Sequence, residues 1–337
     1  MKLNLSQIKD VTLGAVRIEE AGDGIHFYRF TKEQEELYKD RKNSFYVKSF
    51  STSGVQMRFR TNSQTIFLSV DVSAGTTRSY FSFDIFVNGE KTDDLKNFCD
   101  SEMSSEYVSA KFPLGNFSKT ICIGEGDKDV CIYFPWSVMA VLKEFSIDDG
   151  AFITPVKPNK KMLCFGDSIT HGYDAAHPSN KYITKLAAAL DAEEYNKAIG
   201  GEIFFPALAG AKEDFEPDYI TVAYGTNDWS HCTKEVFAKN CKEFYDILCH
   251  NYPKATVFAI TPIWRKDMTE SKPFGDFMSV RESIREITAE YKNVSVIDGS
   301  DFVPGDESLF SDLRLHPNDK GFEYYAENLT KRVKEIL

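Results

Sequence analysis

The chain has 337 residues, of which 42% are hydrophobic and 27% are charged, a composition typical of a globular protein long enough for two domains. The formal net charge of -11 argues against a surface that binds nucleic acid or an anionic membrane. The N-terminus carries no long apolar run, and nowhere do about 18 apolar residues follow one another, so we expect no signal peptide, anchor or membrane span.

Seven cysteines are present, and no two of them have the C-x-x-C spacing. An odd number without paired spacing predicts reduced thiols in a cytoplasmic protein rather than a disulfide framework. The pattern does not support a tetrahedral zinc site, and we expect neither a metal nor another cofactor.

Residues 1 to about 150 read as β structure. Short runs that alternate apolar and polar residues, or that are rich in β-branched and aromatic residues, predict strands at 55–60, 65–71, 80–87, 130–134 and 140–147. Asn88-Gly89 follows the third run at once and is a strong hairpin signal. Only 32–39 has a helical pattern. This half is predicted to be a two-sheet sandwich of jelly-roll type.

The stretch 148–161 contains a glycine, two prolines and several lysines, and it is the predicted linker. We place the boundary so that 1–152 is an all-β accessory domain and 153–337 is a second, catalytic domain. In the second half, strands are expected at 162–165, 194–199, 218–224, 255–260 and 294–297. Helices are expected at 179–191, from 233, at 277–291 and around 322–333. This alternation predicts a parallel sheet covered on both faces, with a site beyond the carboxyl ends of its strands.

Four polar stretches fall at that carboxyl edge. They are Gly166-Asp-Ser-Ile-Thr170, Asn196-Lys-Ala-Ile-Gly-Gly201, Gly225-Thr-Asn-Asp-Trp229 and Asp312-Leu-Arg-Leu-His-Pro-Asn318. Taken singly, each also fits an ordinary turn, cap or helix entry. Four of them at one edge are much less expected by chance.

Together the four stretches predict acyl transfer. Ser168 would attack an acyl carbon, and His316 would remove its proton and later return it to the leaving oxygen. The N–H groups of Ser168 and Gly201 and the amide of Asn227 would hold the oxyanion.

These same blocks resemble the four sequence blocks of the SGNH (GDSL-type) hydrolases, in the order that the family has them, over about residues 160–337. The resemblance implies a flavodoxin-like three-layer α/β/α domain and a serine esterase without a metal. It assigns Ser168 as nucleophile, Gly201 and Asn227 as oxyanion donors and His316 as base. The G-x-S-x-G elbow of α/β-hydrolases is absent, since position 170 is threonine.

Two positions depart from the family pattern. Ala198 stands where many relatives have glycine. The family's aspartate lies three residues before the histidine, a position held here by Leu313, while Asp312 lies one residue further away. Either Asp312 reaches His316 through a local bulge and completes a triad, or the site is a Ser–His dyad whose ring another group orients.

A β-sandwich ahead of such a domain resembles the arrangement of carbohydrate esterase family 2. The predicted substrate is therefore an oligosaccharide or small-molecule ester, and the predicted reaction is removal of O-acetyl groups. Trp264, Trp229 and Tyr173 are candidates for contact with a sugar ring, although core or rim packing explains them equally well.

The alternatives are a thioesterase or short-chain lipolytic esterase and, in another class, a non-catalytic carbohydrate-binding protein. We expect the sandwich to buttress the catalytic domain. The sequence leaves the sugar, the acetyl position and the oligomeric state open.

Overall fold

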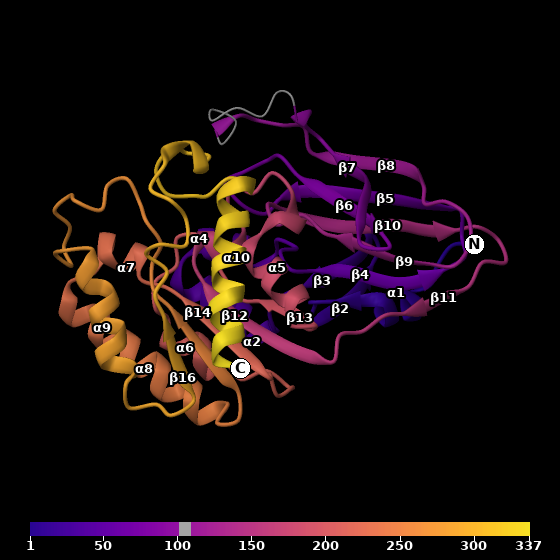
Figure 1. Ribbon diagram of the computed structural model, residues 1–337. Coiled ribbons are helices and arrows are strands. Elements are labelled where there is room, and N and C mark those ends of the chain that lie inside the picture. Colours follow the sequence, from indigo (N-terminus) through magenta and orange to yellow (C-terminus); the bar gives the residue numbers. More distant parts are fainter. Residues whose placement is uncertain (101–108) are drawn as a thin grey trace.

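A computed structural model describes residues 1–100 and 109–337. Two antiparallel sheets lie at one end of the molecule, and a parallel sheet with helices around it lies at the other (Figure 1). The expected order of an all-β half followed by an α/β half is confirmed.

The N-terminal half consists of two antiparallel sheets. The first has the order β1–β4–β9–β6–β7, with β11 paired to β4, and the second has the order β2–β3–β10–β5–β8. The strands of the first sheet are β1 (Thr12–Leu13), β4 (Gln56–Thr61), β9 (Lys128–Tyr133), β6 (Ser82–Val87), β7 (Glu90–Lys96) and β11 (Ile153–Pro155). Those of the second are β2 (Arg17–Ala21), β3 (Gly24–Tyr28), β10 (Val138–Ile147), β5 (Thr65–Ala74) and β8 (Gly115–Cys122).

Alternation of side chains explains the packing of these sheets. In β5, Ile66, Leu68 and Val70 are fully buried while their neighbours are partly exposed, because successive side chains of a strand point to opposite faces. Asn88 and Gly89 both have positive φ, 51° and 85°, as the tight turn between β6 and β7 requires. β7 was not predicted from sequence, because only Leu95 in it is buried and its pairing with β6, rather than a pattern, makes it a strand.

Three short helices lie in the N-terminal half, namely α1 (Leu5–Val11), α2 (Lys32–Arg41) and α3 (Asn43–Ser49). Helix α1 packs on the core of the sandwich, whereas α2 and α3 pack against the α/β half. A capping box between Thr31 and Gln34 begins α2. Phe30, Tyr38 and Phe45 are buried in a core otherwise built from the α/β half. Conversely, β11 hydrogen-bonds to β4 of the sandwich. The division at 152/153 stays a proposal, with these exchanges across it.

The parallel sheet has the order β13–β12–β14–β15–β16. Its strands are β12 (Lys160–Gly166), β13 (Ala192–Asn196), β14 (Tyr219–Ala223), β15 (Thr256–Ile260) and β16 (Val294–Ile297). In chain order this is 2-1-3-4-5, the flavodoxin-like order, which places a site where the winding reverses, beyond the ends of β12 and β14.

Helices cover both faces of the parallel sheet (Figure 1). Along β12, Leu163 and Phe165 pack on one side and Met162 and Cys164 on the other, a double-sided burial that explains the unbroken apolar run. The helices of the first side are α6 (Pro206–Gly210), α8 (Lys234–Asn251) and α9 (Met278–Thr288), and those of the second are α5 (Tyr182–Ala189) and α10 (Asp319–Ile336). Of the helices in the described residues, none has both the length and the apolar character of a membrane span.

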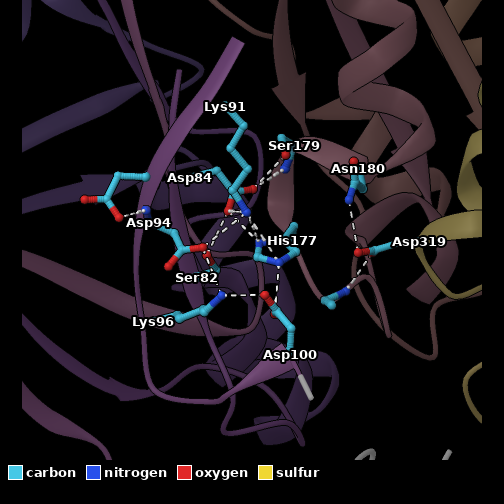
Figure 2. A network of polar contacts seen from close by, with 12 residues as sticks. Ser82, Asp84, Lys91, Asp94, Lys96, Asp100, His177, Ser179, Asn180 and Asp319 are labelled. Carbon is cyan, nitrogen blue, oxygen red and sulfur yellow. Dashed lines mark hydrogen bonds and ion pairs between the residues drawn. The ribbon is translucent and has the colours of Figure 1, made fainter. Parts of the chain in front are cut away.

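A polar network joins the sandwich to the loop that follows α4 (Ser168–His171), as Figure 2 shows. Asp84 of β6 is fully buried, and its carboxylate lies 2.7 Å from Nδ1 of His177. The other oxygen of Asp84 accepts from the N–H and the hydroxyl of Ser179 at 3.1 and 2.7 Å. Lys91 and Asp100 complete the surroundings of the His177 ring.

The charge of this network predicts a pH-dependent stability. Burial lowers the pKa of His177, but the hydrogen bond and charge of Asp84 outweigh this and raise it above 6.5. Burial raises the pKa of Asp84, but its contacts with His177 and Lys91 outweigh burial and lower this pKa to about 2. The stabilisation by His177 is therefore complete below about pH 6.5 and is lost as pH rises through the raised pKa. The stabilisation by Asp84 is lost only below about pH 4.

We expect His177→Gln to lower the melting temperature most at pH 5–6 and least above pH 8. Thermal unfolding of both proteins across this range measures the difference. His231→Gln, at an exposed histidine, is the matched control. A melting-temperature difference that does not change with pH would mean that His177 is not charged in the folded protein.

Candidate active site

Ser168 lies where β12 turns into the short helix α4. Asp167 caps this helix, with its carboxylate accepting from the N–H of Ile169 at 3.0 Å. Gly166 closes the strand, and a Cβ there would lie 2.3 Å from Oγ1 of Thr170. No larger residue fits at this turn, which holds the Ser168 hydroxyl at the carboxyl edge of the sheet.

His316 and Asp312 stand in line behind Ser168. Nε2 of His316 lies 2.9 Å from Oγ of Ser168, and Nδ1 of His316 lies 2.8 Å from Oδ2 of Asp312. With Nδ1–H donated to the carboxylate, Nε2 is free to accept the proton of the hydroxyl. This is the arrangement of a nucleophile, a general base and an orienting group.

Asp312 reaches the ring through a tight turn. Leu313, three residues before His316, takes a left-handed conformation with φ 55°. Oδ1 of Asp312 accepts from the N–H groups of Arg314, Leu315 and His316 at 2.7–3.1 Å. This leaves Oδ2 for the imidazole. The extra residue is absorbed by the turn, so the structure places Asp312 within hydrogen-bond reach despite its shifted position.

The electrostatics of the site favour a charged imidazole. Burial lowers the pKa of His316, but the hydrogen bond to Asp312 and the charge of Asp174 outweigh burial and raise it above 6.5. The pKa of Asp312 is held far below its usual range, since the contacts with His316 outweigh its burial. Burial also raises the pKa of Asp167 to about 6.

The loop after β13 supplies the predicted oxyanion donors. Gly201 has φ 89°, a conformation that favours glycine. Within the described part of the chain, the N–H groups of Ser168 and Gly201 make no hydrogen bond to a protein acceptor, which leaves both for a ligand. Asn227 donates from Nδ2 to the carbonyl of Glu202 at 2.9 Å, and this contact orients its amide beside the loop.

Side chains of the N-terminal half hold this loop from behind. Arg29 is 1% exposed and donates from Nη1 to the carbonyls of Asn196 and Ala198 at 2.7 and 3.2 Å. Lys48 of α3 donates to the carbonyl of Gly200 at 2.5 Å. These contacts fix the carbonyls of Asn196, Ala198 and Gly200 and so hold the backbone of this loop in place.

The far end of the loop is fixed in the same manner. Glu202 is fully buried and accepts from the hydroxyl of Tyr38 at 2.6 Å and from Arg41. Burial outweighs these contacts and raises the pKa of Glu202 to about 7. Nδ1 of His171 accepts from the N–H of Gly200 at 3.3 Å. Burial lowers the pKa of His171 well below its usual value, consistent with a neutral ring that accepts at Nδ1.

The three predicted substrate contacts differ in position. Tyr173 packs against the His316 ring at 5.7 Å between centroids and lies against Gly200, so it forms a wall of the site. Trp264 is partly buried against Phe310. Trp229 is 0% exposed, and its indole N–H donates to the carbonyl of Gly275. The expectation for Trp229 is not met, because a buried indole offers no face to a sugar.

Two clusters among the described residues have the composition of a metal site. Asp174, Asp312 and His316 form one, and Asp84, Asp94 and His177 form the other. In the second, the Lys91 ammonium lies 2.9 Å from Nδ1 of His177 and 3.3–3.4 Å from the two carboxylates (Figure 2). The Lys91 ammonium therefore takes the position, and supplies the positive charge, that a metal ion would have in this cluster.

Sequence reasoning missed the residues that support the site from a distance. Arg29 and Lys48 lie in a stretch that showed no motif, and Asp174 follows Ser168 in the chain but was not singled out. A basic residue in an otherwise apolar segment, such as Arg29 between Tyr28 and Phe30, is the one signal that points to a buried cation.

Residues 164–324 match the GDSL-like lipase/acylhydrolase family, a match that spans all four sequence blocks. No curated protein sequence matches the chain. The comparison with solved structures finds similar folds at low identity. Salicylyl-acyltransferase SsfX3 from a tetracycline biosynthetic pathway superposes with a TM-score of 0.76 at 19% identity, covering 96% of this chain and 94% of that chain.

Two further structures share the fold. A protein described as a GDSL-like lipase from Bacteroides ovatus has a TM-score of 0.77 at 16% identity, covering 100% of this chain and 97% of that one. A family two carbohydrate esterase from Clostridium thermocellum, in complex with cellohexaose, has a TM-score of 0.63 at 16% identity, covering 85% and 93%. At these identities the likeness concerns the fold, and it extends over both halves of the chain.

The geometry at Ser168 predicts a specific chemical reactivity. A fluorophosphonate should label Ser168 and fail to label the Ser168→Ala variant. Because a neutral His316 must accept the hydroxyl proton, labelling should slow as pH falls through a pKa above 6.5, and His316→Ala should slow it by about 100-fold or more. Mass spectrometry of the labelled peptide over time measures the rate, with the exposed His231→Ala as control. Equal labelling rates in the wild type and His316→Ala would remove His316 as the base.

Arg29 provides a second prediction. Arg29→Met keeps most of the side-chain volume but leaves buried carbonyls without a donor, at a cost of about 1–3 kcal/mol for each one. We expect a lower melting temperature and fluorophosphonate labelling slowed by about 10- to 100-fold, because the oxyanion donors lose their alignment. Arg60→Met, at an exposed arginine of β4, is the matched control. Unchanged labelling in Arg29→Met would mean that the loop keeps its shape without the guanidinium.

Proposed function

Because residues 164–324 match the GDSL-like lipase/acylhydrolase family, we propose that this protein is a serine esterase that removes O-acetyl or other short acyl groups from carbohydrate. The observation that carries the proposal is the hydrogen-bonded line from Oγ of Ser168 through His316 to Asp312, with contacts of 2.9 and 2.8 Å. A nucleophile, a base and an orienting carboxylate at these distances are the parts that acyl transfer needs.

The proposed reaction proceeds in two halves. Oγ of Ser168 attacks the acyl carbon while its proton passes to Nε2 of His316, and Asp312 stabilises the imidazolium. The negative charge on the former carbonyl oxygen is met by the N–H groups of Ser168 and Gly201 and by the amide of Asn227. His316 then gives the proton to the departing sugar oxygen. Water, activated by the same ring, releases the acid from the acyl-enzyme and restores the serine hydroxyl.

The surroundings of Ser168 support a short acyl group. A Cβ on Gly201 would lie 3.6 Å from the ring of Phe45, and one on Gly200 would lie 2.5 Å from the ring of Tyr173. These rings therefore stand close beside the oxyanion loop. Such walls fit acetyl better than a long chain.

The carbohydrate part of the proposal rests on fold and chemistry together. The family two carbohydrate esterase shares the layout of both halves, and the ring of Tyr173, which is 4% exposed, packs against His316. Two alternatives remain within the enzyme class: a thioesterase or short-chain lipolytic esterase, and transfer of the acyl group to an acceptor hydroxyl, as the name of the acyltransferase neighbour suggests. A non-catalytic carbohydrate-binding protein is the alternative of another class. We also propose a reducing, cytoplasmic location, since Cys122, Cys131, Cys164, Cys232, Cys241 and Cys249 form no disulfide.

A panel of esters tests the proposal. We expect hydrolysis of p-nitrophenyl acetate to exceed that of the octanoate by at least about 10-fold in kcat/KM, because the rings of Phe45 and Tyr173 stand close beside Gly201 and Gly200. Acetylated xylo- and manno-oligosaccharides should be deacetylated faster than acetyl-CoA, and Ser168→Ala should be inactive on all of them.

The other outcomes separate the alternatives. Preference for octanoyl or acyl-CoA substrates would replace the carbohydrate proposal by a lipolytic enzyme or a thioesterase. Acetylated acceptor sugar, detected by mass spectrometry when free sugar is added, would show transfer. Full activity of Ser168→Ala would remove the serine mechanism.

A further inference from the structure

His316 faces a second carboxylate besides Asp312. Asp174 is 0% exposed, and its Oδ2 lies 3.4 Å from Nδ1 of His316, the same nitrogen that contacts Asp312 at 2.8 Å. Asp174 follows α4 by three residues and has a left-handed backbone with φ 71°. Its backbone carbonyl accepts from the hydroxyl of Ser311, next to Asp312. The two carboxylates therefore approach Nδ1 from connected segments.

An arginine of the sandwich half holds the second carboxylate. Arg78, in the segment between β5 and β6, donates from Nε to Oδ1 of Asp174 at 2.7 Å and from Nη2 to Oδ2 at 3.1 Å. The hydroxyl of Tyr80 adds a contact to Oδ1 at 3.3 Å. A bidentate contact with a guanidinium fixes the plane of a carboxylate and also places a positive charge beside it. The carboxylate of Asp174 is thus held in place, with Oδ2 toward Nδ1 of His316.

The charged groups around His316 form a short series, of which Asp174 and Asp167 are buried and the others partly buried. Asp312 and Asp174 face Nδ1, Arg78 lies behind Asp174, and Asp167 lies beside Ser168. Both carboxylates favour the imidazolium and Arg78 opposes it. Because these groups are shielded from water, their mutual effects are stronger than at the surface.

We propose that Asp174, held by Arg78, is a second positioning carboxylate for His316, through which the sandwich half acts on the catalytic base. This inference rests on the esterase function proposed above. When Nε2 takes the proton of Ser168, the Nδ1–H of the imidazolium stays between two carboxylates. If Asp312 is lost, Asp174 remains to accept that N–H and to keep Nε2 directed at the serine.

Removal of each carboxylate in turn tests this. Asp312→Asn keeps the oxygen that accepts from the three turn N–H groups but loses the charge. Loss of a lone orienting aspartate in this way costs a serine enzyme about 10⁴-fold in kcat. We expect Asp312→Asn to cost only about 10- to 100-fold on p-nitrophenyl acetate. Asp174→Asn should cost less, and the double variant should fall by about 10⁴-fold.

The pH profile distinguishes positioning from a general structural effect. Asp174→Asn removes a negative charge, so the acid limb of kcat/KM should move to lower pH. Arg78→Gln removes a positive charge and should move the same limb to higher pH. Arg78→Lys should keep the limb near its wild-type position while lowering kcat, since one contact replaces two. Asp319→Asn, a largely buried aspartate that does not face His316, should leave the limb in place. Loss of fold alone would not shift the limb in opposite directions.

Some results would overturn the inference while leaving the esterase proposal intact. One is an Asp312→Asn variant as inactive as Ser168→Ala; another is a double variant equal to Asp312→Asn. If Asp174→Asn does not fold, as its melting curve would show, the Arg78 pair decides alone, and an acid limb that stays in place in Arg78→Gln overturns the inference. Failure of the esterase proposal has a different signature, namely a Ser168→Ala variant that retains activity.

Discussion

The arrangement of the site depends on the contacts that the guanidinium of Arg29 makes. This guanidinium is buried, and its contacts are four backbone carbonyls and the hydroxyl of Ser51. Burial lowers its pKa to about 9, which leaves it charged at neutral pH. A buried cation without a carboxylate is costly unless every donor finds an acceptor. The carbonyls of Asn196 and Ala198 are among those acceptors, so the oxyanion loop and the cation stabilise each other.

The two halves of the chain are consequently parts of one functional unit. Arg29 and Lys48 hold the loop after β13. Arg78 holds the carboxylate of Asp174 beside His316. The contact between Asp84 and His177 fixes the loop that follows α4. All of these contacts run from the sandwich half to the α/β half. The sandwich half therefore does more than cover a face of the α/β half: its side chains hold in place the loop that carries the predicted oxyanion donors.

The sequence allowed much of this to be predicted, for identifiable reasons. The apolar run before Ser168 and the alternation of strands and helices determine the parallel sheet, and a parallel sheet brings its carboxyl ends together. The four polar stretches therefore had to share an edge. What could not be predicted depends on contacts between distant residues. Strand β7 exists because β6 pairs with it, and Arg29 is separated from Asn196 by 167 residues.

The position of Asp312 illustrates a different limit. Counting residues back from His316 suggested a displaced carboxylate, because counting assumes a regular backbone. The left-handed Leu313 shortens the path, and the three N–H groups that Asp312 accepts define the turn. Trp229 shows the reverse case, since its place after β14 correctly suggested the site edge, but its indole turns into the core. Position along the chain predicted the edge, and packing decided which side chains reach it.

The separation between Arg29 and Asn196 also has a consequence for how the protein acquires its shape. A contact that spans so much of the chain closes a long loop, and such contacts form late because their entropic cost must be met by earlier packing. The serine turn is local and can form with β12 alone, whereas the oxyanion loop must wait until both halves have folded and docked. During synthesis the N-terminal half emerges first, with Arg29 and its neighbours lacking partners. The loop that carries the predicted oxyanion donors would therefore take its final shape last, after the two halves have docked.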